Sequence, residues 1–112
     1  MTGIKSYRDL EVWQRSMDVV VNVYRCTKMF PQAENYGLTN QIRRSSVSIP
    51  SNIAEGHSKP TKDFARFLNI AIGSVAELET QLELDHRIGY LEKKEFHHLT
   101  SELSVIGKQL NT

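Results

Sequence analysis

The sequence predicts a single all-α domain over residues 1–112, folded as an up-down-up-down antiparallel four-helix bundle. Apolar residues recur at steps of three and four along four long stretches, the spacing of helices that pack along one face. Short joints containing Pro31, Gly56 and Gly89 separate these stretches. No segment shows the period-two alternation of a β-strand. With 112 residues, 39% of them hydrophobic, the chain can form one modest core.

The first predicted helix covers about residues 7–29, with Ser6 as its N-cap and Pro31 beyond its end. It carries two apolar stripes that point about 120–140° apart. The stripe expected to face the core contains Leu10, Trp13, Met17, Val20, Tyr24 and Thr27. The second stripe contains Val12, Val19, Val23, Cys26 and Phe30. Because a bundle helix needs only one apolar stripe, we expect the second stripe to contact another copy of the chain.

The second predicted helix covers about residues 36–55 and is stopped by Gly56. Its core stripe consists of Leu38, Ile42, Ser46, Ile49 and Ile53. Pro50 lies inside this helix, where the loss of a backbone donor and a steric clash cost about 3 kcal/mol. We expect Pro50 either to bend the helix or to split it, with Ser48 able to cap the following piece.

The third predicted helix covers about residues 61–87, with Ser58 or Thr61 as its cap and Gly89 at its exit. Its core stripe contains Phe64, Phe67, Leu68, Ala71, Val75, Leu78 and Leu82. A neighbouring, mostly small-residue face carries Ala65, Ile72, Gly73 and Ala76, and a helix of this chain or of another subunit could approach it closely. The fourth predicted helix covers about residues 92–110 and has Phe96, Leu99, Leu103, Ile106 and Leu110 at heptad spacing.

The residues that could catalyse a reaction or bind a metal form no recognised arrangement. His97 and His98 are adjacent, so on a helix they point about 100° apart. His86 belongs to no repeated Glu-x-x-His pair. Cys26 lies on an apolar stripe, where burial raises the pKa of a thiol and leaves it inert. A Gly-x-Ser-x-Gly elbow and a Walker-type loop are both missing. We therefore expect no enzymatic activity, no metal and no cofactor, and a nuclease is disfavoured because no paired carboxylate site is visible.

Composition also predicts where the protein works. A single cysteine, Cys26, cannot form an internal disulfide, which suits a reducing compartment. The start of the chain, Met1 to Lys5, is not followed by the apolar run of a signal peptide. No stretch approaches the roughly 20 apolar residues that span a bilayer. We expect the bacterial cytoplasm, with no membrane partner.

Two small groups of cations are candidates for binding phosphate. The arginine pair, Arg43 and Arg44, lies on the second helix, and a turn cluster of Lys59, Lys62 and Arg66 flanks the entry to the third. Arginine forks match phosphate oxygens well, although a net charge of +1 gives no general argument for nucleic acid. The alternative is that Arg43 or Arg44 pairs with a carboxylate such as Glu55. The helix rise separates Arg44 from the turn by about 20 Å, so only a ring of copies could merge the two groups into a belt.

Five segments together resemble the 23S rRNA intervening-sequence proteins, a family of four-helix bundles related to the retroelement accessory protein Avd. The central segment, Gln41 to Gly56, contains the arginine pair, a hydroxyl-rich run and Pro50. The others are Ser6–Trp13, Tyr36–Gln41, Phe64–Leu82 and Gly89–Leu91, so the resemblance covers nearly the whole chain. Two departures stand out. Lys59 replaces a common arginine, and Asp85-His86 fills a position that is usually small or apolar, which makes the end of the third helix more polar.

The resemblance implies a ring-shaped homopentamer with a basic surface that binds nucleic acid. A closed five-fold ring needs heterologous interfaces, which the two-faced first helix and the small-residue face of the third would supply. The basic surface is assigned to Arg43, Arg44, Lys59, Lys62 and Arg66, and the subunit interface to Val12, Val19, Val23, Phe30, Ala65, Ile72, Gly73 and Ala76. We expect a non-catalytic RNA- or DNA-binding protein, a chaperone or scaffold for structured RNA. The alternative is a protein-interaction ring that docks a polymerase or reverse transcriptase without binding nucleic acid itself.

Overall fold

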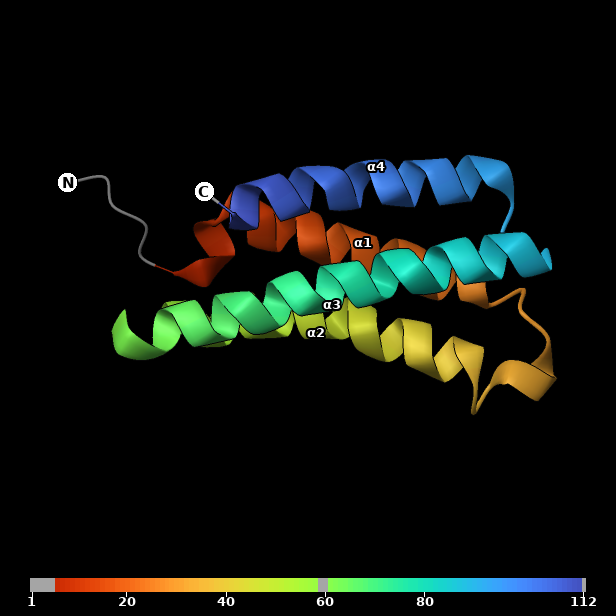
Figure 1. Ribbon diagram of the computed structural model, residues 1–112, viewed down its shortest axis with the longest axis horizontal. Helices are drawn as coiled ribbons and strands as arrows, with labels where there is room; N and C mark the ends of the chain where they lie inside the picture. The colour runs from red at the N-terminus through yellow and green to blue at the C-terminus, as the bar shows by residue number, and fades with distance from the viewer. Residues whose placement is uncertain (1–5, 59–60, 112) are drawn as a thin grey trace.

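The fold is an antiparallel bundle of four α-helices, seen in a computed structural model that describes residues 6–58 and 61–111, with only the backbone described at Thr61. Two short 3-10 helices, η1 (Tyr7–Asp9) and η2 (Gln32–Glu34), precede the first two α-helices. The α-helices are α1 (Glu11–Thr27), α2 (Leu38–Ser58), α3 (Thr61–Ile88) and α4 (Lys93–Leu110). In Figure 1, α1 and α3 run in one direction and α2 and α4 in the other, and both ends of the chain lie at the same end of the bundle.

The four helices enclose one core. Along the described chain α1 packs against α2 and α4, and α3 packs against the same two helices, so neighbours in sequence are neighbours in space. The buried core contains Val19, Val23, Ile42, Ile49, Ile53, Ala71, Val75, Leu78, Leu82, Leu91, Leu99, Leu103, Ile106 and Leu110. The predicted core stripes of α2 and α4 supply most of their expected members to this core, which confirms an all-helical, four-helix fold.

The first helix begins later than predicted. Ser6 does act as a cap, since its hydroxyl accepts from the backbone nitrogen of Arg8 at 3.1 Å, but the element that it caps is η1. Leu10 then adopts extended backbone angles, φ −75° and ψ 125°, and α1 starts at Glu11. The continuous helix over residues 7–29 was therefore wrong at its first turn, because a local cap closed a single 3-10 turn before the α-helix began.

The second apolar stripe of α1, which was predicted to contact another copy, faces the core of its own chain. Val19 and Val23 are only 1% and 0% exposed, and Phe30 is also buried, so these residues contact the core of their own chain. Val12 and Cys26 are partly buried against the same core. In the other stripe, Met17 is 39% and Tyr24 40% exposed. The assignment of Val19, Val23 and Phe30 to a subunit interface is therefore wrong, while that of the partly buried Val12 stays a prediction. Helix α1 does have surplus apolar surface, but it lies on the Trp13–Met17–Tyr24 side, over α2.

Pro50 neither splits nor ends α2. The helix runs from Leu38 to Ser58, past the predicted stop at Gly56. A proline at this position removes one bond, the one that the carbonyl of Ser46 would accept, and the flanking turns keep theirs. Gly56 serves packing instead, because a Cβ atom there would lie 3.1 Å from the Cβ of Phe67 in α3. The small residue lets α2 and α3 approach closely near their connection.

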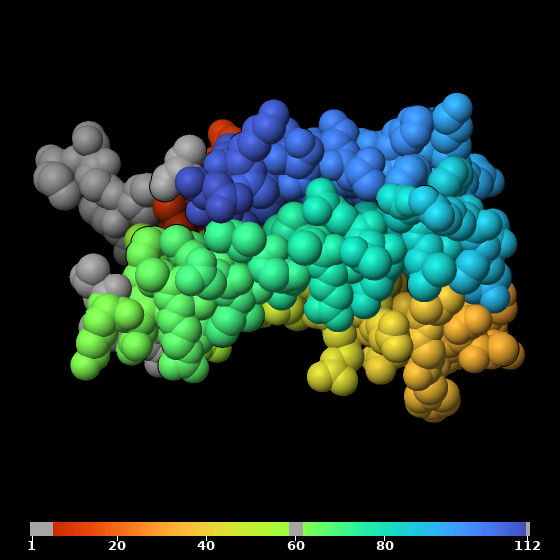
Figure 2. All heavy atoms as spheres, viewed as in Figure 1, coloured from red at the N-terminus to blue at the C-terminus, as the bar shows by residue number. Residues whose placement is uncertain are grey.

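Helix α3 leaves its predicted small-residue face open. Ala65, Gly73 and Ala76 are exposed, and a Cβ atom added at Gly73 would meet nothing within 4 Å. Ile72 differs, since it packs partly buried against the core. Figure 2 shows α3 filling the middle of one broad face of the molecule. Packing within the monomer therefore does not explain the small residues at these three positions. The helix ends at Gly89, whose φ of 100° confirms the predicted exit.

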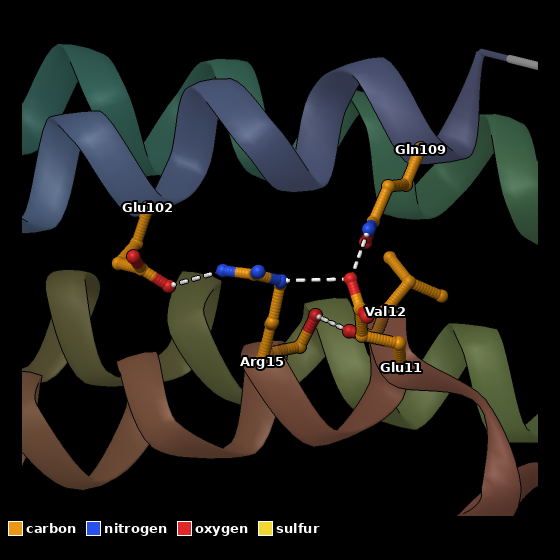
Figure 3. A network of polar contacts seen from close by, with 6 residues as sticks. Glu11, Val12, Arg15, Glu102 and Gln109 are labelled. Carbon is orange, nitrogen blue, oxygen red and sulfur yellow. Dashed lines mark hydrogen bonds and ion pairs between the residues drawn. The ribbon is translucent and has the colours of Figure 1, made fainter.

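A polar network joins α1 to α4 at the end where the termini lie. Arg15 contacts the carboxylates of Glu11 at 3.1 Å and Glu102 at 3.2 Å, and the side-chain amide of Gln109 donates to Glu11 (Figure 3). The hydrogen bonds from Gln109 and Arg15 lower the pKa of Glu11. Solvent screens exposed ion pairs of this kind, so the network aligns two helices that the apolar core already holds together.

Candidate nucleic-acid interface

Arg43 is fixed in place between α1 and α2. Its Nε donates to the hydroxyl of Thr27 at 2.8 Å, and a terminal nitrogen donates to the carbonyl of Tyr24 at 3.4 Å. The guanidinium also lies over the ring of Tyr24, 4.5 Å from its centroid, in a cation–π contact. Thr27 in turn donates to the carbonyl of Val23 at 2.8 Å. Arg43 therefore presents a positive charge at a fixed position, with part of its guanidinium already used inside the chain.

Arg44 points away from these contacts. Its side chain is exposed, and no ion pair within the described chain involves either arginine, so the alternative pairing with Glu55 does not occur there. An open pocket of about 610 Å³ lies beside it, lined by Tyr24, Asn40, Arg43, Arg44, Val47, Ser48, Ser51 and Asn52. Guanidinium, amide and hydroxyl groups can all donate hydrogen bonds, so this arginine pocket suits an anion.

The polar residues beneath the arginine pair hold α2 against α3. Ser45 donates to Gln81 at 2.5 Å, and the hydroxyls of Ser48 and Ser74 lie 2.7 Å apart. The side-chain amide of Asn52 donates to the carbonyl of Ser48 at 2.8 Å. The serines thus allow α2 and α3 to pack closely, because small hydroxyls satisfy one another where the two helices meet. The part of α2 that carries Arg44 is therefore held against α3 and supports the binding surface.

The turn cluster lies far from the arginine pair. Lys59 falls outside the described residues, while Lys62 and Arg66 are exposed on the first turns of α3. The guanidinium of Arg66 rests 5.1 Å from the centroid of the Phe67 ring. Helix rise places the end of α2 about 20 Å from Arg44, and Figure 1 shows the α2–α3 connection at one tip of the bundle. A single chain therefore does not bring Lys62 and Arg66 into one patch with the arginine pair.

An apolar groove adjoins the arginine pocket, and the sequence analysis did not predict it. The groove lies between α1 and α2, has a volume of about 360 Å³, and is lined by Tyr7, Trp13, Met17, Val20, Val47, Pro50, Ser51 and Ala54. Val47 and Ser51 line both hollows, so the two lie side by side on α2. Its α1 residues had been assigned to the core. The signal that could have revealed the groove is the presence of two apolar stripes on α1, only one of which a bundle can cover.

The candidate catalytic and metal-binding residues stay apart. In the part of the chain that the structure describes, no group of three His, Cys, Asp or Glu side chains could hold a metal ion. The thiol of Cys26 lies 3.7 Å from a carboxylate oxygen of Glu95, and burial, with that carboxylate, raises the pKa of Cys26 to about 11. Such a thiol is protonated at neutral pH and a poor nucleophile. His86 contacts the carbonyl of Leu91 at 2.9 Å and stacks on Phe96.

Asp85 is the most unusual charged residue of the fold. It lies near the end of α3, is 0% exposed, and neither carboxylate oxygen has a hydrogen-bond partner in the described chain. Burial, together with the nearby Glu34 carboxylate, raises its pKa to about 6. Position 85 follows Leu78 and Leu82 at the step of the core stripe, a spacing that could have predicted its burial. Asp85 lies on a different helix from the arginine pocket.

No helix in the described part of the chain is long and apolar enough to cross a membrane.

Two comparisons with known proteins match nearly the whole chain. A family model described as 23S rRNA-intervening sequence protein matches residues 8–112. Among solved structures, a protein of unknown function from the S23 ribosomal protein family of Bacteroides thetaiotaomicron is similar, with a TM-score of 0.80 and 29% sequence identity. The match covers 88% of this chain and 94% of that one. No curated protein matches the chain.

Proposed function

Because the chain belongs to the 23S rRNA-intervening sequence protein family, we propose that it is a non-catalytic nucleic-acid-binding protein, with RNA as its expected ligand. The observation that carries this proposal is the arginine pocket. There an exposed Arg44, which forms no ion pair with the described residues, stands beside the hydrogen-bonded Arg43 and the amides of Asn40 and Asn52. A phosphate backbone supplies the anionic oxygens that such donors bind.

The protein would act as a homopentamer, so that the ring presents five copies of the arginine pocket, one from each subunit. Multiple phosphate contacts on one surface give an affinity that a single pocket cannot reach, and they make it strongly dependent on salt. Of the predicted interface residues, Ala65, Gly73 and Ala76 of α3 remain exposed for contact with a neighbouring copy. A basic ring without catalytic groups fits a chaperone or scaffold for structured RNA.

The decisive experiment is a mobility-shift titration with a labelled structured RNA at several salt concentrations. We expect a shift at low salt, with an apparent affinity that falls steeply as salt rises. Arg44→Glu should weaken binding at least about tenfold, since it replaces a phosphate contact by a repulsive charge. Lys94→Glu is the matched control, because it makes the same charge change at an exposed position on α4. No retardation of RNA or DNA by the wild type at low salt would overturn the proposal.

The stoichiometry is tested separately by light scattering coupled to size exclusion. Five chains of 12.8 kDa give a particle of about 64 kDa. Gly73→Trp should disrupt this particle if α3 contacts a neighbouring copy, while leaving the helix content unchanged because a Cβ atom at this position would meet no packed neighbour within 4 Å in the described chain. A purified protein that elutes as a monomer at micromolar concentration would contradict the ring. Binding that persists at high salt through a co-purifying polypeptide would favour a protein-docking function instead.

A further inference from the structure

The apolar groove between α1 and α2 is a surface that the fold itself does not need. Met17 and Val47 face it and are each 39% exposed, although the bundle core is complete without them. The ring of Trp13 is held edge-on against Tyr7, with centroids 5.4 Å apart. The groove is therefore an open apolar hollow, lined in part by one indole whose ring packs against Tyr7. Its volume of about 360 Å³ falls in the range of small-molecule sites.

The charge beside the groove limits what can occupy it. The groove adjoins the arginine pocket, since Val47 and Ser51 line both. Arg44 lies one helical turn before Val47 on α2, so a ligand in the groove is within reach of the guanidinium. Hydrogen-bond donors, not acceptors, dominate the side chains of the arginine pocket. An occupant must therefore combine a flat apolar part with an anionic group a few ångströms away.

We propose that this groove takes an unpaired nucleobase while Arg44 binds its phosphate, so that the nucleic acid bound here is single-stranded at the point of contact. This inference rests on the proposed nucleic-acid function and narrows it. A base in a duplex is stacked and paired, and its face cannot enter a slot between two helices. A base of a loop or single strand is free to do so, and contact with an aromatic side chain raises affinity about 5- to 150-fold.

Trp13 provides the direct test, because it is the only tryptophan of the chain. The assay compares three probes at the same low salt concentration: a single-stranded RNA 12-mer, its duplex, and a single-stranded DNA of the same sequence. We expect the single strands to quench the fluorescence of Trp13 and the duplex to leave it unchanged. Affinity measured by anisotropy should be at least about tenfold higher for single-stranded RNA than for duplex RNA.

A pair of matched variants separates the groove from the rest of α1 and α2. Val20→Gln changes a residue that lines the groove but not the arginine pocket, and Val21→Gln makes the same change at the next residue of α1, which lines neither. Val20→Gln should reduce single-strand affinity about tenfold and leave duplex affinity unchanged, whereas Val21→Gln should affect neither. Circular dichroism confirms that both variants remain helical, and the wild-type comparison of single strand and duplex does not depend on them.

The outcomes distinguish a failure of this inference from a failure of the proposed function. If none of the three probes binds at low salt, both are overturned. If duplex and single strand bind equally, Trp13 is not quenched, and Arg44→Glu still abolishes binding, the function stands and the base-binding groove is wrong. A Trp13 emission that shifts to the blue with protein concentration, without nucleic acid, would show that a second copy covers the groove and would also overturn the inference.

Discussion

Arg43 and Asp85 both have side chains that are at least partly buried, but they differ in their hydrogen-bond partners. Arg43 is half-buried and has three partners: the Thr27 hydroxyl, the Tyr24 carbonyl and the Tyr24 ring. Asp85 is wholly buried and has none for its carboxylate, so its pKa rises to about 6. A buried charge is tolerated cheaply only when its hydrogen bonds are replaced. The difference marks Arg43 as part of a built surface and Asp85 as a source of instability at neutral pH.

The largest effect should come from pH acting on Asp85. The pKa of Asp85 is about 6 in the folded state, against an ordinary value of 3.8. Between pH 3.8 and about 6, the folded state therefore holds a proton that the unfolded state has already released. The contribution of Asp85 to the free energy of unfolding is therefore greatest below about pH 4. It falls as pH rises through 6, with a total loss of about 2–3 kcal/mol from this group. Asp85→Asn, which cannot ionise, should lack this loss.

Urea unfolding of wild type and Asp85→Asn at one protein concentration, from pH 4.5 to pH 8, measures the difference directly. The variant should gain on the wild type as pH rises and should be the more stable protein at pH 8. Parallel curves for the two proteins across this range would mean that Asp85 finds a compensating partner in solution.

Removing Arg43 should have the next largest effect, in the opposite direction. Arg43→Ala loses hydrogen bonds from a charged donor and a cation–π contact, which together stabilise the fold by about 2 kcal/mol. The measurement is the free energy of unfolding in urea at pH 7. Lys28→Ala, at an exposed position just after α1, is the control and should change stability by less than about 0.5 kcal/mol. A similarly small change at Arg43 would show that its contacts to α1 are not formed in solution.

A lysine at position 43 tests the geometry of the contact apart from its charge. Arg43→Lys keeps the positive charge but has no planar fork to reach Thr27 and Tyr24 together, so we expect a loss of about 1 kcal/mol. Thermal unfolding monitored by circular dichroism is sufficient to rank wild type, lysine and alanine. Equal stability of the lysine and wild-type proteins would reduce the role of Arg43 to charge alone.

The smallest effect on stability should come from the neighbouring arginine. Arg44 is exposed and without an ion pair in the described chain, so Arg44→Ala should change the unfolding free energy by less than about 0.5 kcal/mol. The same variant should weaken RNA binding about tenfold in the mobility-shift assay. A loss of binding without a loss of stability is expected only if Arg44 contacts the nucleic acid while Arg43 holds α2 against α1. A loss of stability as large as that of Arg43→Ala would contradict this division.

Much of the fold followed from the pattern of apolar residues. The core stripes of α2 and α4 and the exit of α3 at Gly89 were predicted, because each depends on spacing within one helix. The sequence did not decide whether Pro50 bends or splits its helix. The answer depends on whether the packing energy of the whole helix exceeds the cost of one lost backbone hydrogen bond. Of the candidate site, the sequence predicted the arginine pair but not the adjoining groove, which two helices form together.

The sequence by itself determined four amphipathic helices, their order and the presence of more apolar surface on the first helix than one bundle can cover. Only the tertiary structure decided that Val19 and Val23 face the core while Trp13 and Met17 line an open groove. It also decided that Arg43 is hydrogen-bonded to α1 while Arg44 forms no ion pair in the described chain. Finally, it decided that the carboxylate of Asp85 is buried without a hydrogen-bond partner among the described residues. The physical reason is that helical periodicity fixes which residues share a face. Which face is buried depends on the direction from which the neighbouring helices approach.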